Sequence, residues 1–167
     1  NLNRLLKRGK LSDAEKVETL KHLTLSTNIS ELRECDLVIE AATEDEEVKR
    51  RIYDKICPLL KKDAILASNT SSISITRLAA QTDRPEQFIG VHFMNPAPLM
   101  ELIELISGIA TDQSVYDTIH EFVLKLNKPC ILCADTFCEL RYALYAASVA
   151  RGSTFPPENI LAVRNLG

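Results

Sequence analysis

The stretch GVHFMNPAPLMELIELI, residues 90–106, joins two apolar runs, FIGVHF and ELIELI, through a proline-rich turn. His92 lies near the end of the first run, and Glu104 lies within the second. If the turn is a tight reversal, the carboxylate and the imidazole become neighbours. The carboxylate then fixes the tautomer of the ring and leaves the other nitrogen available to accept a proton. The structural alternative is a histidine bonded to backbone at a sheet rim, and we favour chemistry over it.

Five nearly continuous apolar runs have the length of strands: CDLVIEAA, AILASN, FIGVHF, ELIELI and PCILCA. Such runs are typical of strands buried on both faces. Helical spacing of apolar residues marks three segments between or before them, residues 12–23, 45–60 and 112–126. This order of elements predicts an α/β fold with a mostly parallel sheet flanked by helices.

Polar residues follow three of the expected strands, at the points where parallel sheets bind ligands. They are Glu40 and Glu44 after the first run, Asn69, Thr70, Ser71 and Ser72 after the second, and His92 and Asn95 after the third. We therefore expect three strand ends to converge on one crevice. Each residue also has an ordinary alternative: Ser71 or Ser72 caps a helix that begins near Ile73, and Asn95 shapes the turn before Pro96.

Composition narrows the class of protein. The 167 residues suffice for one ordinary domain. With 20 Lys and Arg against 23 Asp and Glu, the net charge of −3 gives no general attraction to nucleic acid or to anionic lipid. No apolar run reaches the roughly 20 residues of a membrane helix. We expect a cytoplasmic protein with no nucleic-acid or membrane partner.

The five cysteines are odd in number and lie mostly in apolar segments, which favours buried, reduced thiols over a disulfide framework. Cys130 and Cys133 form a CxxC motif. Because this motif falls in an expected strand, its two side chains should point to opposite faces of the sheet. We favour a structural role for both thiols over a metal or redox site.

Three segments together resemble a known family: DLVIEAATEDEEVK, ILASNTSSISIT and FIGVHFMNPAPLMELIELI. They are similar to the short-chain L-3-hydroxyacyl-CoA dehydrogenases, most closely the bacterial 3-hydroxybutyryl-CoA dehydrogenases. The resemblance implies a partial Rossmann-like fold whose first βαβ unit is missing. It also implies that residues 1–136 are a truncated NAD-binding domain and that residues 137–167 are a divergent remnant of the C-terminal helical domain.

The resemblance implies NAD-dependent oxidation of (S)-3-hydroxyacyl-CoA, such as 3-hydroxybutyryl-CoA, to 3-oxoacyl-CoA, and the reverse. His92 matches the general acid/base of the family, and Glu104 matches its orienting partner. Ser71 matches a catalytic-site residue that lies near both the substrate oxygen and the cofactor, and Asn95 is a further substrate-side position. The positions that contact NAD in the family are matched by Glu44, Lys49, Ser71 and Asn95. No metal is implied.

The sequence departs from the family in two places. It has no GxGxxG loop for the cofactor diphosphate. It also reads DTFCELRYAL where the family reads DTPGFxxNR, with Tyr142 at the position of the Asn. We therefore expect weak or no activity from the isolated chain, and the domain that forms the family's homodimer is largely absent.

The alternative to an enzyme is a non-catalytic, truncated binding or assembly module, because missing front strands leave a sheet edge open to another chain. A related sugar-acid dehydrogenase is the less favoured enzyme.

Overall fold

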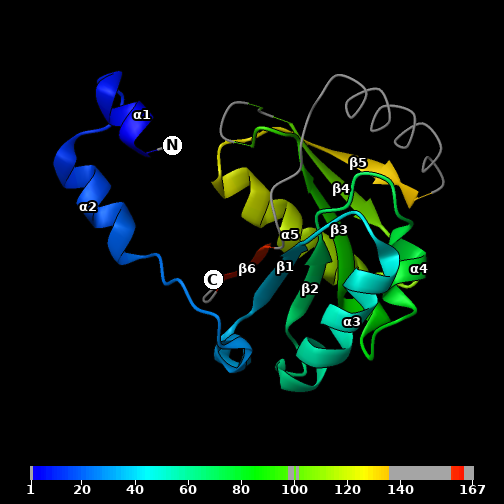
Figure 1. The fold of residues 1–167 in the computed structure, drawn as a ribbon. Helices are drawn as coiled ribbons and strands as arrows, with labels where there is room; N and C mark the ends of the chain where they lie inside the picture. The colour runs from blue at the N-terminus through cyan, green and yellow to red at the C-terminus, as the bar shows by residue number, and fades with distance from the viewer. Residues whose placement is uncertain (1, 98–99, 101, 136–158, 164–167) are drawn as a thin grey trace.

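The computed structural model describes residues 2–97, 100, 102–135 and 159–163, which form one sheet with helices on both faces (Figure 1). The sheet has six strands in the order β5-β4-β3-β2-β1-β6. Their bounds are β1 Leu37–Ala41, β2 Ile65–Ser68, β3 Phe88–Phe93, β4 Ile103–Ser107, β5 Cys130–Ala134 and β6 Asn159–Val163. The five predicted strands are confirmed, and β6 was not predicted.

The described residues also form five α-helices and three short 3-10 helices, of which α1, α2 and η1 precede the first strand. The α-helices are α1 Leu2–Lys7, α2 Asp13–Lys21, α3 Glu46–Ile56, α4 Ile75–Ala79 and α5 Gln113–Lys125, and the 3-10 helices are η1 Ile29–Glu34, η2 Cys57–Leu59 and η3 Pro85–Gln87. The three predicted helices are confirmed within a few residues at their ends. The structural alternative for Ser71 and Ser72 is not what the structure shows: α4 begins at Ile75 and Ser74 caps it, while the hydroxyl of Ser71 contacts His92 and that of Ser72 donates to Glu44.

Strand direction reverses twice across the sheet, between β3 and β4 and between β1 and β6. The pairs β1–β2, β2–β3 and β4–β5 are parallel, whereas β3–β4 and β1–β6 are antiparallel. The mostly parallel sheet is therefore confirmed. The reversal between β3 and β4 places the amino end of β4 beside the carboxyl ends of β1, β2 and β3, so side chains of two strand directions meet at one edge.

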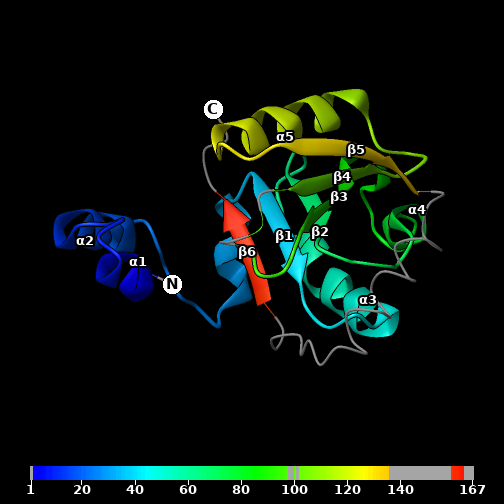
Figure 2. The same cartoon turned by 90° about the horizontal axis from the view of Figure 1, so that it is seen from above.

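The two faces of the sheet have separate cores (Figure 2). One packs Val38 with residues of α3 and α4, and the other packs Leu37 and Ile39 with residues of α5. This alternation follows from the two-residue period of a strand. Cys133 packs on the first core and Cys130 on the second, which confirms that the CxxC side chains face opposite ways.

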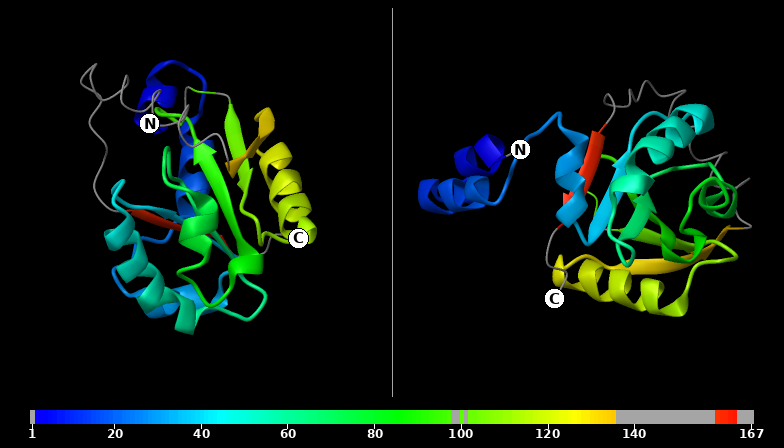
Figure 3. Two further views of the ribbon diagram at one scale, coloured as in Figure 1. Left: turned by 90° about the vertical axis from the view of Figure 1, so that its right-hand side faces the viewer. Right: turned by 90° about the horizontal axis from the view of Figure 1, so that it is seen from below.

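The helices α1 and α2 form a hairpin that stands to one side of the sheet (Figures 1 and 3). Neither helix contains a buried residue. Across the described ranges, no helix combines the length and the apolar character that crossing a bilayer demands. The proposed boundary after residue 136 stays a prediction, because residues 137–158 and 164–167, Tyr142 among them, lie outside the described residues.

Gly90 in β3 allows α4 to approach the sheet. A Cβ atom at this position would lie 2.8 Å from the Cδ1 atom of Ile75 and 2.9 Å from the Cβ atom of Ile106. Both neighbours are completely buried, so neither can move away easily.

We predict that Gly90→Ala lowers the free energy of unfolding by about 1–3 kcal/mol, the usual cost of overpacking a core. Urea denaturation of the variant and the parent chain measures this difference. Glu121→Ala, on the exposed side of α5, is the control and should leave the midpoint in place. An unchanged midpoint for Gly90→Ala would contradict the close packing of α4 on β3.

Asp135, just after β5, ties that strand to the start of α4. Its carboxylate accepts hydrogen bonds from the hydroxyl of Ser74 at 2.8 Å and from the backbone N–H groups of Ile75 and Thr76 at 2.8 and 2.9 Å. Partial burial opposes its ionisation, but the hydrogen bonds from Thr76, Ser74 and Ile75 outweigh burial, and the pKa of Asp135 lies below its ordinary value of 3.8.

A carboxylate with a lowered pKa in the folded state stabilises that state above its ordinary pKa, and this contribution disappears as the pH falls through the lowered value. We predict that Asp135→Asn lowers the free energy of unfolding by roughly 1–2 kcal/mol at neutral pH. The difference from the parent chain should shrink below about pH 4. Urea denaturation across this pH range checks it, and a pH-independent difference would contradict the role of the charge.

Candidate active site

His92 and Glu104 lie directly opposite each other on β3 and β4. The Nδ1 atom of His92 is 2.6 Å from the Oε2 atom of Glu104, and the two side chains are 13% and 14% exposed. The sequence predicted this neighbour relation on condition that the turn NPAPLM is a tight reversal, and the antiparallel register of β3 and β4 places the two side chains side by side.

Ser71 contacts the other nitrogen of the same ring. Its Oγ atom is 3.1 Å from the Nε2 atom of His92. With Glu104 ionised, Nδ1 carries the proton and donates it to the carboxylate, so Nε2 accepts from the Ser71 hydroxyl. The ring is thus held at both nitrogens, and Nε2 is the basic atom that a substrate hydroxyl can approach beside Ser71.

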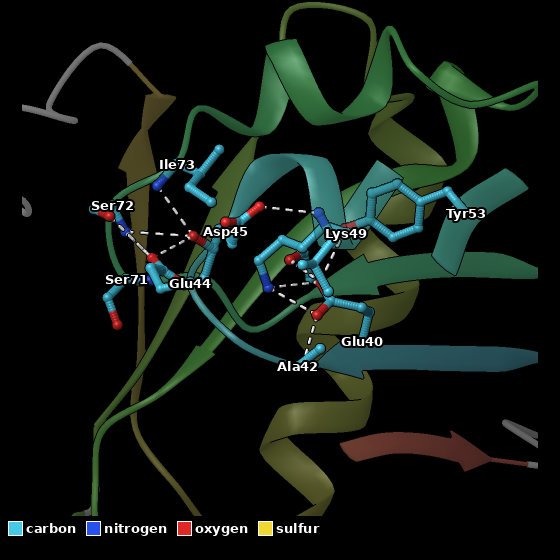
Figure 4. A network of polar contacts seen from close by, with 12 residues as sticks. Glu40, Ala42, Glu44, Asp45, Lys49, Tyr53, Ser71, Ser72 and Ile73 are labelled. Carbon is cyan, nitrogen blue, oxygen red and sulfur yellow. Dashed lines mark hydrogen bonds and ion pairs between the residues drawn. The ribbon is translucent and has the colours of Figure 1, made fainter. Parts of the chain in front are cut away.

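Glu44 organises the turn that presents Ser71 (Figure 4). Its Oε1 atom accepts hydrogen bonds from the backbone N–H groups of Ser71 and Ser72 at 2.7 and 2.8 Å. The hydroxyls of Thr70 and Ser72 donate to the same oxygen at 2.7 and 3.0 Å. The loop after β1 therefore holds the loop after β2, and the predicted convergence of three strand ends is confirmed by these contacts.

The two asparagines of the region differ in position. Asn69 follows β2, and its Oδ1 atom accepts the backbone N–H of Phe93 at 2.8 Å, next to His92. Asn95 lies in an exposed part of the turn after β3. Asn69 thus fixes the end of β3, whereas the predicted contact of Asn95 with substrate and cofactor stays a prediction.

Lys49 does not contact His92, Ser71 or Glu44 but binds another carboxylate. The residue is 0% exposed, and its Nζ atom donates to both carboxylate oxygens of Glu40, at 2.7 and 2.8 Å. Tyr53 and Ser68, which sequence reasoning missed, donate to the same carboxylate. The signal that could have identified this cluster is the charge of Glu40 inside an otherwise apolar strand.

Among the residues that the structure describes, no group of three or more His, Cys, Asp or Glu side chains could hold a metal ion. The site combines a histidine at the carboxyl end of β3, a carboxylate near the amino end of β4 and a hydroxyl that follows β2. These features define a class of protein, a Rossmann-like domain with polar side chains at the ligand-binding edge of its sheet.

Comparison with known proteins identifies the family. The family described as 3-hydroxyacyl-CoA dehydrogenase, NAD binding domain, matches residues 1–136. The chain therefore belongs to this family, which confirms the resemblance seen in the sequence, the class of NAD-dependent dehydrogenases, and NAD as the cofactor of the domain.

Individual relatives agree with this result. The chain is 53% identical over 135 residues to a 3-hydroxybutyryl-CoA dehydrogenase of Bradyrhizobium diazoefficiens, a match that covers 81% of this chain and 46% of that protein. It is 44% identical over 128 residues to the enzyme of the same name from Clostridioides difficile, covering 77% of this chain and 46% of that one. The chain spans about half the length of these curated relatives.

A solved structure shows the same fold. The crystal structure of (S)-3-hydroxybutyryl-CoA dehydrogenase from Ralstonia eutropha superposes with a TM-score of 0.78 at 43% sequence identity. The match covers 80% of this chain and 47% of that one. The partial Rossmann-like fold predicted from the sequence is thus confirmed.

We predict that Glu104→Ala removes the preference for the Nδ1-protonated ring of His92, because no carboxylate remains to accept that proton. The ¹⁵N chemical shifts of the neutral imidazole report which nitrogen is protonated. Glu121→Ala is the matched control, since it removes an exposed carboxylate far from the ring. Identical imidazole spectra for Glu104→Ala and the parent chain would contradict the pairing.

Proposed function

We propose that this chain carries the proton-transfer centre of an NAD-dependent (S)-3-hydroxyacyl-CoA dehydrogenase that interconverts the 3-hydroxyacyl and 3-oxoacyl thioesters. The names of its relatives favour 3-hydroxybutyryl-CoA as the substrate. The observation that supports the proposal most is a single one: His92 is held between Glu104 on Nδ1 and Ser71 on Nε2.

In this proposal, the Nε2 atom of His92 removes the proton of the 3-hydroxyl group as the C3 hydrogen leaves as a hydride. Glu104 stabilises the positive charge that the ring then carries. The substrate hydroxyl replaces the Ser71 hydroxyl on the lone pair of Nε2, and the Ser71 hydroxyl then donates to the substrate oxygen and holds it in place. In the reverse direction, the imidazolium returns the proton to the 3-oxo oxygen. Bound NAD supplies the acceptor of the hydride.

The residues around His92 suit the nicotinamide end of NAD better than they suit its diphosphate. The turn next to His92 offers the partly exposed hydroxyl groups of Ser71 and Ser72 to a nicotinamide and its ribose. Glu44 orders this turn, so we assign it to the cofactor side. The diphosphate has no such cradle, because the sequence contains no GxGxxG loop and the ammonium group of Lys49 already donates to Glu40. We therefore expect weak NAD binding and slow turnover.

The assembly alternative rests on a sheet edge left open by missing front strands. In the described part of the chain β6 pairs with β1 along all five residues of that strand, so β6 is the edge strand on this side, and the alternative stays a prediction. Dimerisation and a cytoplasmic location stay predictions.

We predict slow oxidation of NADH by the chain in the presence of acetoacetyl-CoA, and a further loss of about 10²–10⁴-fold for His92→Ala, the usual contribution of a general acid/base. The rate is followed by NADH absorbance at cofactor concentrations that saturate binding, with binding measured separately by fluorescence.

His22→Ala is the matched control, because His22 lies just after α2, as its C-cap, with its side chain 77% exposed. Its rate should equal that of the parent chain. Turnover that persists unchanged in His92→Ala, or the absence of any turnover from a folded chain saturated with NADH, would contradict the proposed function.

A further inference from the structure

The carboxylate of Glu40 is the centre of a buried polar cluster beneath the active-site loops (Figure 4). Glu40, Lys49, Tyr53 and Ser68 are each 0% exposed. The carboxylate accepts two bonds from Lys49, one from the Tyr53 hydroxyl at 2.9 Å and one from the Ser68 hydroxyl at 2.7 Å. We call these four residues the Glu40 cluster.

Such a cluster is a costly way to fill a core. Removing two charges from water carries a desolvation penalty that their attraction often only offsets, and apolar replacements of buried pairs are commonly as stable or more stable. Stability alone therefore gives a weak reason for an ion pair at this place. The contacts that the cluster makes with its surroundings give a stronger one.

Two backbone bonds connect Glu40 to the ends of neighbouring strands. Its Oε1 atom accepts the backbone N–H of Ala42 at 2.7 Å, which sets the start of the loop that carries Glu44. Its own backbone carbonyl accepts the N–H of Asn69 at 2.8 Å, immediately after β2. The first residues of the loops after β1 and β2 are thus both hydrogen-bonded to Glu40.

Both loops lead to His92. From the first, Glu44 binds the backbone N–H of Ser71, whose hydroxyl contacts the Nε2 atom of the ring. From the second, Asn69 binds the backbone of Phe93, the residue after His92. A shift of the carboxylate of Glu40 would therefore displace Ala42 and the loop that carries Glu44, and with that loop the Ser71 hydroxyl at Nε2.

We infer that Lys49 is a positioning residue of the catalytic site, which acts by holding the carboxylate of Glu40 in place, and is not a cofactor ligand. Its ammonium group is buried and points at Glu40 from α3, one layer below the crevice. This role rests on the proposed function of His92, but it concerns the placement of the ring and can be measured without turnover.

The test compares Lys49→Met with Lys61→Met. Both variants lose a lysine that is ion-paired to an acidic residue at β1, but Lys61 binds Asp36, which immediately precedes the amino end of the strand, away from the crevice. Two readouts are taken on the full chain: the ¹⁵N shifts of the His92 imidazole with amide exchange of Ala42, Ser71 and Ser72, and the dissociation constant of NADH.

For Lys49→Met we expect changed ¹⁵N shifts of His92 and several-fold faster exchange at the amides of Ala42, Ser71 and Ser72. The dissociation constant of NADH should stay within about threefold of the parent value, well below the tenfold change that about 1.4 kcal/mol represents. Lys61→Met should leave the His92 shifts unchanged. A tenfold or larger rise in the NADH constant with unchanged His92 shifts would overturn the inference and return Lys49 to the cofactor. Unchanged values in both readouts would also overturn it.

A second pair of variants covers the event that Lys49→Met fails to fold. The double variant Glu40→Gln with Lys49→Met removes both charges and keeps acceptors and donors for Ala42, Tyr53 and Ser68, so it should fold and still displace the His92 signals. Tyr53→Phe removes one hydroxyl from the cluster and should move the same signals less. His92 signals identical to the parent in both variants would overturn the inference, whereas turnover in any variant tests only the proposed function.

Discussion

The antiparallel pairing of β3 with β4 is the constraint on which the site depends. In a wholly parallel sheet, the strand beside β3 would also end at the ligand-binding edge, and its first residues would lie at the opposite edge. The reversal brings the beginning of β4 to this edge instead, so that Glu104 lies across from His92 only twelve residues after it in sequence. A cross-strand neighbour relation, which any antiparallel pair provides, here brings a carboxylate to one nitrogen of an imidazole.

The parallel pairs contribute what the reversal cannot. Because β1, β2 and β3 all end at the same edge, the loops that follow β1 and β2 can bind each other before either reaches β3. Glu44 and Ser71 meet in this way, and the hydroxyl of Ser71 arrives at the second nitrogen of the ring. The parallel strands therefore bring Ser71 to one nitrogen of His92, and the antiparallel β4 brings Glu104 to the other.

Much of this arrangement could be read from the sequence, because it is encoded in local patterns. The five apolar runs and the helical spacing of residues 112–126 depend on neighbours a few residues away, and they were predicted correctly. The ion pair of Lys49 with Glu40 could not be predicted, because Glu40 belongs to a strand and only the packing of α3 on the sheet buries the pair. The cap of α4 was missed for a similar reason: Glu44, from another loop, binds the backbone N–H groups of the earlier serines. The strand β6 was missed because its pairing with β1 joins residues more than a hundred positions apart.

The hairpin of α1 and α2 has a consequence for how the molecule opens. Neither helix buries a residue, and the main cores of the molecule lie on the two faces of the sheet. Its hydrogen bonds are therefore broken by local fraying, independently of the cooperative unit that contains the sheet, α3, α4 and α5. Protection against amide exchange will divide the described chain into two classes, with the boundary between α2 and β1. The catalytic edge belongs to the slowly exchanging class, and so the geometry around His92 is insulated from motions of the hairpin.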